Sequence, residues 1–359
     1  MRRRAVVAAV ALVLVVLGGL LAGQLPGRSP AGGTTRTGPL QLGVNSLALW
    51  EDWEVLPALL DRVRDAGTRW VRADLAWCAW EPEGPGLVAT SYRERVDELV
   101  RLVADRHLQL LLVTVCTPGW AGGGPDGRAL PADPAEFGRV VGVLAARYAG
   151  RVSAWEVWNE PDCIGGCGKG SAVGYVPLLQ AGYRAVKAAD PRATVVSGGI
   201  SGNNARWVDD LYAAGAAGWF DALGVHPYVK PSGLAPDAPS GHRVYRLTTI
   251  SDVRGVMVRH GDGDRPVWFT EFGWSTARSG PIAGVGEARQ ARRLTETVRL
   301  VAARWPFVTH AFWYSARDRD DSTPLENSFG LLRTDLTPKP AYRAFRSAAT
   351  DPGLVGAPG

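Results

Sequence analysis

The stretch Leu108–Val115, LQLLLVTV, is apolar at all but two of its eight positions. A strand with one face in water alternates apolar and polar residues, whereas a nearly continuous apolar run is typical of a parallel sheet whose outer face is covered by helices. The stretch ATVVSG at 193–198 has the same character. Eight segments are predicted to form such strands: 41–46, 69–75, 108–115, 152–159, 194–199, 221–227, 265–271 and 307–314.

Stretches with helical spacing separate these segments. Their apolar residues recur at three- and four-residue intervals, as in the sets Leu56, Leu59, Leu60 and Val63; Tyr92, Val96, Leu99, Val100 and Val103; and Leu294, Val298 and Val301. Eight strand–helix units of about 40 residues each predict a single (β/α)8 TIM barrel. A doubly wound open sheet is the alternative, but Asn45-Ser46-Leu47 stands after the first strand where that fold carries a glycine-rich phosphate-binding sequence.

The charge of the chain is concentrated at its start. Of the 40 Lys and Arg residues, five arginines lie in the first 38 residues, which contain no acid, so the remaining residues balance 35 basic against 35 acidic side chains. The basic isoelectric point therefore belongs to the N-terminal segment. This distribution argues against a nucleic-acid surface, and nucleic acid is not expected as a partner.

The N-terminus has the pattern of an export signal. Three arginines at positions 2–4 precede an uninterrupted apolar run over residues 5–22. That run just reaches the length of a membrane span, and no clear cleavage site follows it. We predict that residues 1–23 form a signal-anchor helix, or alternatively a cleaved signal peptide.

The rest of the chain divides by composition. Residues 24–38 are rich in Gly, Pro, Ser and Thr and are predicted to be a flexible linker, residues 39–350 the barrel domain, and residues 351–359 a C-terminal tail. The barrel is then extracellular or in the cell envelope, secreted or tethered to the membrane only through the N-terminal segment. It is expected to be a monomer.

Four cysteines in an exported domain are expected to form disulfides. Cys163 and Cys167 enclose only Ile-Gly-Gly, which permits a tight closure, and Cys78 would then pair with Cys116. A four-cysteine zinc site is the alternative, but it requires two short cysteine spacings and the chain has one.

The predicted strands end in polar and aromatic residues. These are Asn45, Asp74 with Trp77, Thr117 with Trp120, Asn159 with Glu160, Ser197, His226 with Tyr228, Glu271, and Trp313. The carboxyl ends of barrel strands meet at one face, where the active sites of this fold lie. Such a mixture at one end of an otherwise apolar set predicts a cleft that binds sugars, whose C–H faces pack on aromatic rings.

Two glutamates stand out in this set. Glu160 ends the fourth strand in WEVWNEP (155–161), and Glu271 ends the seventh in VWFTEFGW (267–274). Strands four and seven face each other across a barrel, and strand alternation predicts Glu156, Trp158 and Glu160 on one face with Asn159 on the other. Glycoside cleavage needs a carboxylic acid and a carboxylate, about 5–5.5 Å apart for retention and about 6.5–9.5 Å for inversion. A buried, salt-bridged glutamate is the structural alternative for each.

The Trp-Asn-Glu-Pro and Thr-Glu-Phe-Gly-Trp stretches resemble those of the clan A retaining glycoside hydrolases, most closely the family 39 and cellulase-like family 5 members. The resemblance extends over residues 41–349, and includes Arg72 and Asp74, His226-Pro227-Tyr228, Trp313, and the late Phe329–Leu332 and Lys339–Tyr342 segments. It implies a retaining β-glycosidase that acts on a poly- or oligosaccharide by double displacement. The pattern implies no cofactor, and no ligand spacing requires a metal. The charged run in the loop 315–338 is either solvated or a site for one cation.

The resemblance also implies roles for single residues. Glu160 would be the general acid/base, which requires a raised pKa, and Glu271 the nucleophile. Asn159 would bind the sugar 2-hydroxyl, and Tyr228 would donate to Glu271. Arg72 would hold Glu271 by charge, or alternatively form a core ion pair with Asp74 or a neighbour. His226 would line the same wall, or alternatively be a hydrogen-bonded barrel residue. The remaining substrate-site candidates are Asp74 itself and the subsite aromatics Trp77, Trp120, Trp274 and Trp313. A carbohydrate-binding barrel without turnover and a transglycosylase are the alternative functions.

Overall fold

The structure is a computed structural model that describes residues 38–46, 53–167, 169–241, 243–277, 284–319 and 325–355. The predicted leader and nearly all of the predicted linker lie outside these residues, as does part of the charged loop 315–338. Among the described helices, none combines the length and apolar character needed to cross a membrane.

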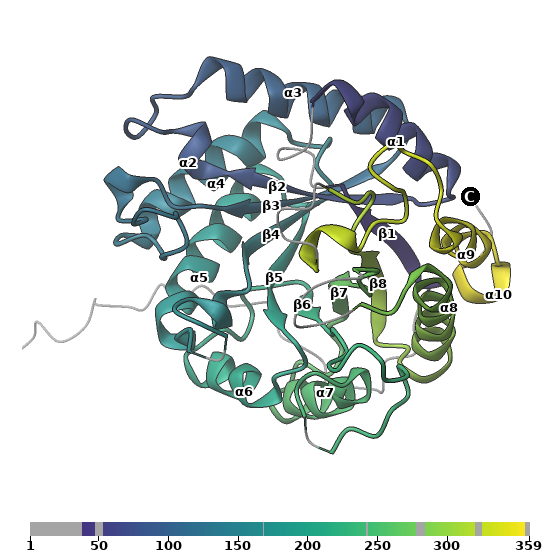
Figure 1. Cartoon of the computed structure of the whole chain (residues 1–359). Coiled ribbons are helices and arrows are strands. Elements are labelled where there is room, and N and C mark those ends of the chain that lie inside the picture. The colour runs from purple at the N-terminus through teal and green to yellow at the C-terminus, as the bar shows by residue number, and fades with distance from the viewer. Residues whose placement is uncertain are drawn as a thin grey trace, which may run out of the picture. The chain divides into compact units, whose positions relative to one another are not determined.

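The eight predicted strands all form and close into one barrel in chain order, β1 to β8 (Figure 1). Their bounds are β1 Gln41–Asn45, β2 Trp70–Ala76, β3 Gln109–Val115, β4 Ala154–Asn159, β5 Thr194–Ser201, β6 Leu223–His226, β7 Val267–Phe272 and β8 Val308–Trp313. Neighbouring strands pair in parallel, and β8 returns to pair with β1. The predicted (β/α)8 TIM barrel is confirmed, and each strand overlaps the segment predicted for it.

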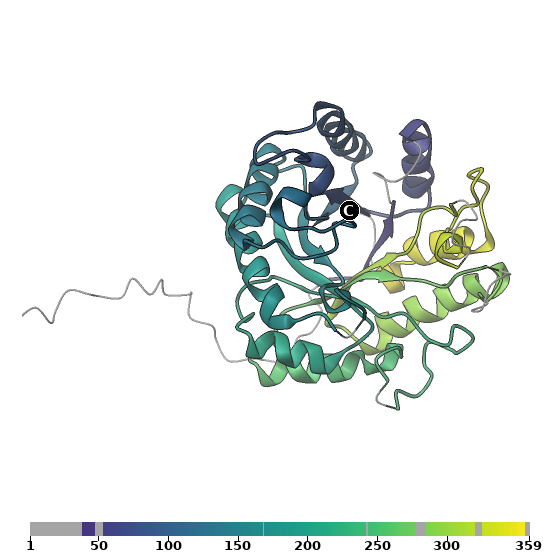
Figure 2. The same cartoon turned by 60° about the vertical axis from the view of Figure 1, so that its left-hand side comes forward.

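Helices surround the barrel on its outside (Figures 1 and 2). The longer ones are α1 Leu56–Asp65, α3 Thr90–Asp105, α4 Pro134–Arg147, α5 Ala172–Ala189, α6 Ala205–Ala213, α7 Ile250–Arg259, α8 Glu287–Arg304 and α9 Pro340–Ala349. Shorter elements are α2 Trp77–Trp80, α10 Pro352–Val355 in the segment expected to be a tail, and the 3-10 turns η1 Trp53–Val55, η2 Gly119–Ala121, η3 Pro161–Cys163, η4 Leu247–Thr249 and η5 Glu326–Ser328. The last long helix, α9, packs along α8, and its Tyr342 hydroxyl donates to the Arg62 carbonyl in α1 at 2.8 Å. The last long helix is thus joined to the first, as β8 is to β1.

The apolar positions predicted from helical spacing face the barrel. In α1 the four residues Leu56, Leu59, Leu60 and Val63 are buried, and the predicted residues of α3 and α8 are buried too, apart from the half-buried Tyr92. Burying such a side chain fully contributes roughly 1.5–3 kcal/mol relative to leaving it exposed. The amphipathic stripe therefore accounts for the position of these helices against the sheet.

Three helices that follow active-site loops begin at a side-chain cap. Asp133 accepts a hydrogen bond from the first turn of α4, and Ser171 and Asn204 do the same for α5 and α6. A cap of this kind contributes about 1 kcal/mol. Since the loops after β3, β4 and β5 run from the carboxyl end of the barrel to these caps, their far ends are fixed.

Aromatic side chains fill the barrel at its amino end. Trp70, Trp268, His310 and Phe312 pack together, and the Trp268 and His310 rings stack with their centroids 3.7 Å apart. Gly43 makes room for this cluster, because a Cβ there would lie 2.3 Å from Cδ1 of Phe312. Burial lowers the pKa of His310 to about 3, so the imidazole is neutral at ordinary pH.

The fourth strand departs from simple alternation at its carboxyl end. Glu156 and Asn159 both bind Arg72 inside the barrel, whereas Trp158 packs against Phe137 in the core outside it. Trp158, Asn159 and Glu160 all border the cavity at the end of the strand. The prediction that Glu156, Trp158 and Glu160 share one face is therefore wrong. The cause is a left-handed backbone at Trp158, with φ of 73°. Gly198 on β5 allows this path, because a Cβ there would lie 2.7 Å from the carbonyl oxygen of Val157 on β4.

The seventh strand carries a bulge next to Glu271. Phe269 is opposite Ala311 in β8, yet Phe272 is opposite Trp313, so three steps on β7 match two on β8. A bulge adds one residue to a strand and redirects the side chains around it. It turns Glu271 toward the cleft.

Candidate active site

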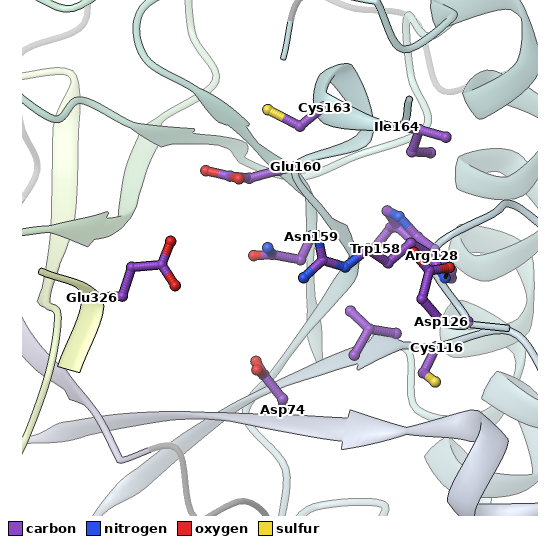
Figure 3. A pocket seen from close by; sticks show the side chains of 12 residues that line it. Asp74, Cys116, Asp126, Arg128, Trp158, Asn159, Glu160, Cys163, Ile164 and Glu326 are labelled. Carbon is purple, nitrogen blue, oxygen red and sulfur yellow. Dashed lines mark hydrogen bonds between the residues drawn. The ribbon is translucent and has the colours of Figure 1, made fainter. Parts of the chain in front are cut away.

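A cavity of about 480 Å³ lies at the carboxyl ends of the strands, where the sequence predicts the active site of a barrel. Its wall includes Asp74, Arg128, Asn159, Glu160, Cys163 and Glu326. Figure 3 shows Asp74, Glu160 and Glu326 projecting toward the same space from different elements, with Asn159 between Asp74 and Glu160 in that view. The predicted residues of β2 and β4 thus lie on the wall of one open cavity.

Glu160 is held at the point where β4 ends. Its backbone adopts the left-handed conformation, with φ of 43° and ψ of 58°, and its N–H donates to the Gly199 carbonyl at 3.0 Å. Pro161 follows and begins the single turn η3. The side chain is 28% exposed, so its carboxylate is accessible from the cavity.

Glu271 is more enclosed, with its side chain 12% exposed. The Tyr228 hydroxyl donates to Oε2 of Glu271 at 2.8 Å, and Nη1 of Arg72 donates to Oε1 at 2.9 Å. Both contacts were expected from the resemblance. Since the two partners donate to different oxygens, they fix the orientation of the carboxylate.

His226 brings the two glutamates together. Its Nδ1 lies 3.0 Å from Oε1 of Glu160 and 3.7 Å from Oε2 of Glu271, while its Nε2 lies 3.1 Å from the Thr270 hydroxyl. The distance between Oε1 of Glu160 and Oε2 of Glu271 therefore cannot exceed the sum of their two distances to Nδ1. Glu160 and Glu271 converge on one accessible site, as their positions on opposed strands predicted.

Arg72 joins four strands beneath this site. Its guanidinium donates to Glu156 at 2.7 Å, to Asn45 and Asn159 at 2.8 Å each, and to Glu271. Both expectations for Arg72 therefore hold, because it forms a core ion pair with its neighbour Glu156 and also holds Glu271. Its contact with Asp74 is longer, at 3.8 Å. Arg72 is 1% exposed. Burial lowers the pKa of Arg72, but the Glu156 and Glu271 charges raise it more, so the guanidinium stays charged.

The pKa of Glu160 departs from expectation. Burial raises it, but the hydrogen bond and charge of His226 lower it, as do Lys230 and Arg72, and the net pKa is below its ordinary value. Burial lowers the pKa of His226, but the two glutamates raise it more, so its net pKa is above its ordinary value. Groups in such close contact titrate as a pair. The pair's proton therefore belongs mainly to His226, whereas the sequence predicted a protonated Glu160.

Two other titratable groups respond to the enclosure of the cleft. Burial, followed by the Glu271 and Glu156 charges, raises the pKa of Asp74 against the pull of Arg72. Burial and the Glu271 charge raise the pKa of Tyr228 well above its ordinary value. The Tyr228 hydroxyl therefore stays protonated and continues to donate to Glu271.

Three of the four predicted subsite tryptophans are buried. Trp77 and Trp313 have no exposed surface and Trp274 is 3% exposed, so none of them presents a ring face to a sugar in this structure. Their indoles pack on other aromatics, Trp274 and Trp313 on each other. Trp120 is the exception. It remains partly exposed, with its Nε1 donating to the Glu81 carbonyl at 2.7 Å.

The sequence analysis missed several residues of this site. Tyr314, one position after Trp313, is partly exposed and lies near Glu271, whose charge adds to burial in raising the pKa of Tyr314. Glu156 is the main partner of Arg72, and its position inside the fourth strand was a usable signal. Arg128 lies in a loop and Glu326 in the short turn η5, where sequence periodicity does not indicate which way a side chain points.

Both predicted disulfides form, and both adjoin the cavity. Cys78 is bonded to Cys116, and Cys163 to Cys167. This pairing excludes the four-cysteine zinc site. Cys116 and Cys163 themselves line the cavity, so each cross-link fixes one part of its wall.

Comparison with known proteins identifies relatives of this barrel. The family model described as cellulase (glycosyl hydrolase family 5) matches residues 39–313. A β-xylosidase from Geobacillus stearothermophilus is 25% identical over 223 residues, which are 57% of this chain and 43% of that protein.

Solved structures give the same picture. A family 39 glycoside hydrolase from Bacteroides cellulosilyticus superposes with a TM-score of 0.73 at 26% identity, over 87% of this chain and 64% of the other. A protein of family 5, subfamily 18, from Streptomyces cattleya, solved in complex with Manβ1-4GlcNAc, has a TM-score of 0.67 at 21% identity, over 86% of this chain and 80% of the other, which shows a shared fold. The chain thus spans less than two thirds of the xylosidase and of the family 39 structure. The resemblance to families 5 and 39 is confirmed.

Proposed function

Because the chain belongs to glycosyl hydrolase family 5, we propose that it is a retaining β-glycoside hydrolase with Glu160 as general acid/base and Glu271 as nucleophile. The observation that carries this assignment is the convergence of both carboxylates on Nδ1 of His226. These contacts limit the distance between one oxygen of Glu160 and one oxygen of Glu271, and that limit is compatible with the ~5–5.5 Å separation of the carboxyl groups in retaining enzymes.

In the first step, an oxygen of Glu271 attacks the anomeric carbon as the bond from that carbon to the leaving oxygen breaks. Glu160 gives its proton to the leaving oxygen, which departs as an alcohol. Arg72 and Tyr228 each donate to one oxygen of Glu271 and fix its direction before attack. The product of this step is a glycosyl ester of Glu271.

In the second step, Glu160, now a carboxylate, accepts a proton from water, whose oxygen attacks the anomeric carbon. The ester bond to Glu271 breaks, the sugar leaves with its original configuration, and Glu160 is protonated again. The low pKa of Glu160 beside His226 suits this second role. For the first role, the proton that His226 shares must pass to Glu160 along their 3.0 Å contact.

Sugar recognition follows from the same wall. Asn159, oriented by Arg72 through its Oδ1, presents its amide nitrogen to the 2-hydroxyl of the cleaved sugar. The carboxylate of Asp74 faces the cavity and is available to accept from sugar hydroxyls. Trp120 and Tyr314 offer partly exposed rings for stacking.

The substrate class is a β-linked oligo- or polysaccharide. Relatives and structural neighbours are described as a β-xylosidase, an exo-β-1,4-mannosidase and an endoglucanase, so β-linked xylose, mannose and glucose are the first candidates. We also propose that the enzyme works outside the cytoplasm as a monomer, secreted or tethered by residues 1–23. Two disulfides suit an oxidising compartment.

A panel of 4-nitrophenyl β-glycosides tests the proposal. The wild type should release nitrophenol from at least one sugar, and NMR should show the β-anomer as the first product. With the phenyl glycoside of the same sugar, whose leaving group is poor, Glu160→Gln should lower kcat/KM by about 10²–10⁴-fold. Glu271→Gln should abolish turnover of both glycosides. Glu98→Gln, on the exposed face of α3, is the matched control and should leave turnover unchanged. Full activity in either active-site variant, or a first product of inverted configuration, would contradict the proposal.

A further inference from the structure

The loop after β4 is closed by a disulfide that lies next to the proposed acid/base. We infer that the Cys163–Cys167 cross-link is a positioning device for Glu160, acting on proton donation to the leaving group. This inference rests on the proposed function of Glu160. It assigns to the disulfide a catalytic effect beyond holding the fold together.

The disulfide lies close to the carboxylate. One carboxylate oxygen of Glu160 and the sulfurs of Cys163 and Cys167 all lie within 4.8 Å of one another. Cys163 and Glu160 line the same cavity, and Figure 3 shows both side chains on one side of it. The Cys163 side chain therefore forms part of the wall near the carboxylate that must give up a proton, and Cys167 fixes it from the exposed side.

The backbone of the loop is built around the same point. The Cys163 N–H donates to the Glu160 carbonyl at 2.9 Å, and the Gly166 N–H donates to the Cys163 carbonyl at 2.9 Å. Buried Asp162 accepts from the Ser201 N–H at 3.0 Å and so ties η3 to β5. Because the left-handed Glu160 is the first residue of this turn, a shift of the turn moves its side chain.

The size of the disulfide loop argues against a mainly global role. A cross-link stabilises by restricting the unfolded chain, and that effect grows with the length of chain enclosed. Cys78 and Cys116 are 38 residues apart, whereas Cys163 and Cys167 are 4 apart. The short cross-link restricts the unfolded chain less, and its main effect is on the local path of the loop.

Without the cross-link, two changes weaken acid catalysis. The η3 turn is free to move away from the cavity, which lengthens the distance from Glu160 to a leaving oxygen. Water then has access to the side of the carboxylate that the sulfurs cover, which favours its charged form. Both changes matter for leaving groups that need a proton and not for those that depart as stable anions.

The test compares aryl β-glycosides of the most reactive sugar with 2,4-dinitrophenol and with phenol as leaving groups. In Cys163→Ala/Cys167→Ala, kcat/KM for the phenyl glycoside should fall at least 10-fold, while that for the dinitrophenyl glycoside should stay within about 3-fold of wild type. Cys78→Ala/Cys116→Ala is the matched control, because it also removes one disulfide lining the cavity. It should change both substrates by the same factor.

A second measurement tests the inference even if Cys163→Ala/Cys167→Ala does not fold. In the Cys78→Ala/Cys116→Ala background, dithiothreitol reduces the remaining disulfide: the S–S bond breaks, each sulfur gains a proton and an electron, and the reagent closes to its cyclic disulfide. Thiol titration should find two new thiols, and the phenyl glycoside alone should lose activity. Equal loss with both substrates, or no loss, would overturn the inference.

Glu160→Gln separates this failure from that of the proposed function. If Glu160→Gln shows the selective loss with phenol and the disulfide variants do not, the positioning inference is wrong and the acid/base assignment stands. If Glu160→Gln shows no selectivity, both are wrong.

Discussion

Removing Arg72 is the strongest perturbation of this site that the structure offers. The Arg72 guanidinium is the charge partner of Glu156, whose side chain has no exposed surface, and it also binds Asn45, Asn159 and Glu271. In Arg72→Met the volume is nearly kept, but Glu156 is left as a buried charge without its partner. Breaking a buried ion pair in this way costs about 3–5 kcal/mol.

The magnitude can be measured by urea unfolding followed by tryptophan fluorescence. A loss of about 3–5 kcal/mol corresponds to a fall in Tm on the order of 10 °C for a domain of this size. The double variant Arg72→Met/Glu156→Gln should recover much of the loss, since it removes the uncompensated charge as well. Arg101→Met is a control on the surface, where the guanidinium is 55% exposed, and should hardly change the midpoint.

Two results would refute this reasoning. An Arg72→Met midpoint equal to that of wild type would mean that the ion pair is not a net contributor. A double variant no more stable than Arg72→Met would mean that the loss comes from packing and not from the Glu156 charge. Activity gives a separate readout, because Glu271 loses one of its two donors in both variants.

The remaining predictions concern pH, recognition and the aromatics. The pKa of His226 is raised in the folded protein, so its proton stabilises the fold below about pH 6.5, and this contribution is lost as the pH rises through the folded pKa. The difference in unfolding free energy between wild type and His226→Asn should therefore be larger at pH 5.5 than at pH 9. An equal difference at the two pH values would contradict the raised pKa. Asp74→Asn should lower kcat/KM about 10–100-fold if its carboxylate binds a sugar hydroxyl, and an unchanged value would remove it from the site. Trp120→Ala should raise KM, measured by steady-state kinetics, with little change in Tm. Trp313→Ala should lower the free energy of unfolding by about 3–5 kcal/mol, which thermal unfolding would detect.

Much of the fold could be predicted from the sequence because each strand is an apolar run between helical stretches. The run at 108–115 matches β3 within one residue, and 194–199 lies inside β5. The two glutamates were predictable for the same reason, since each stands at the end of such a run. Parallel strands in a barrel bring their carboxyl ends together whatever the loops do.

What could not be predicted depends on local departures from alternation. The left-handed residue Trp158 and the bulge before Phe272 change which side chains face the cleft, and neither has a clear sequence signal. The predicted subsite residue Trp313 is buried, whereas Tyr314, the next residue, is partly exposed and lies near Glu271. The low pKa of Glu160 depends on a 3.0 Å contact with His226, and a distance of that kind is set by packing of the whole barrel.

The central claim is that Glu271 attacks the sugar while Glu160 protonates the leaving group. The most direct measurement is trapping with the 2,4-dinitrophenyl 2-deoxy-2-fluoro-β-glycoside of the most reactive sugar, followed by proteolysis and mass spectrometry. The account predicts a single added fluoroglycosyl group on the peptide containing Glu271, formed also in Glu160→Gln. A label on any other carboxylate would contradict it, as would continued release of dinitrophenol without a covalent adduct.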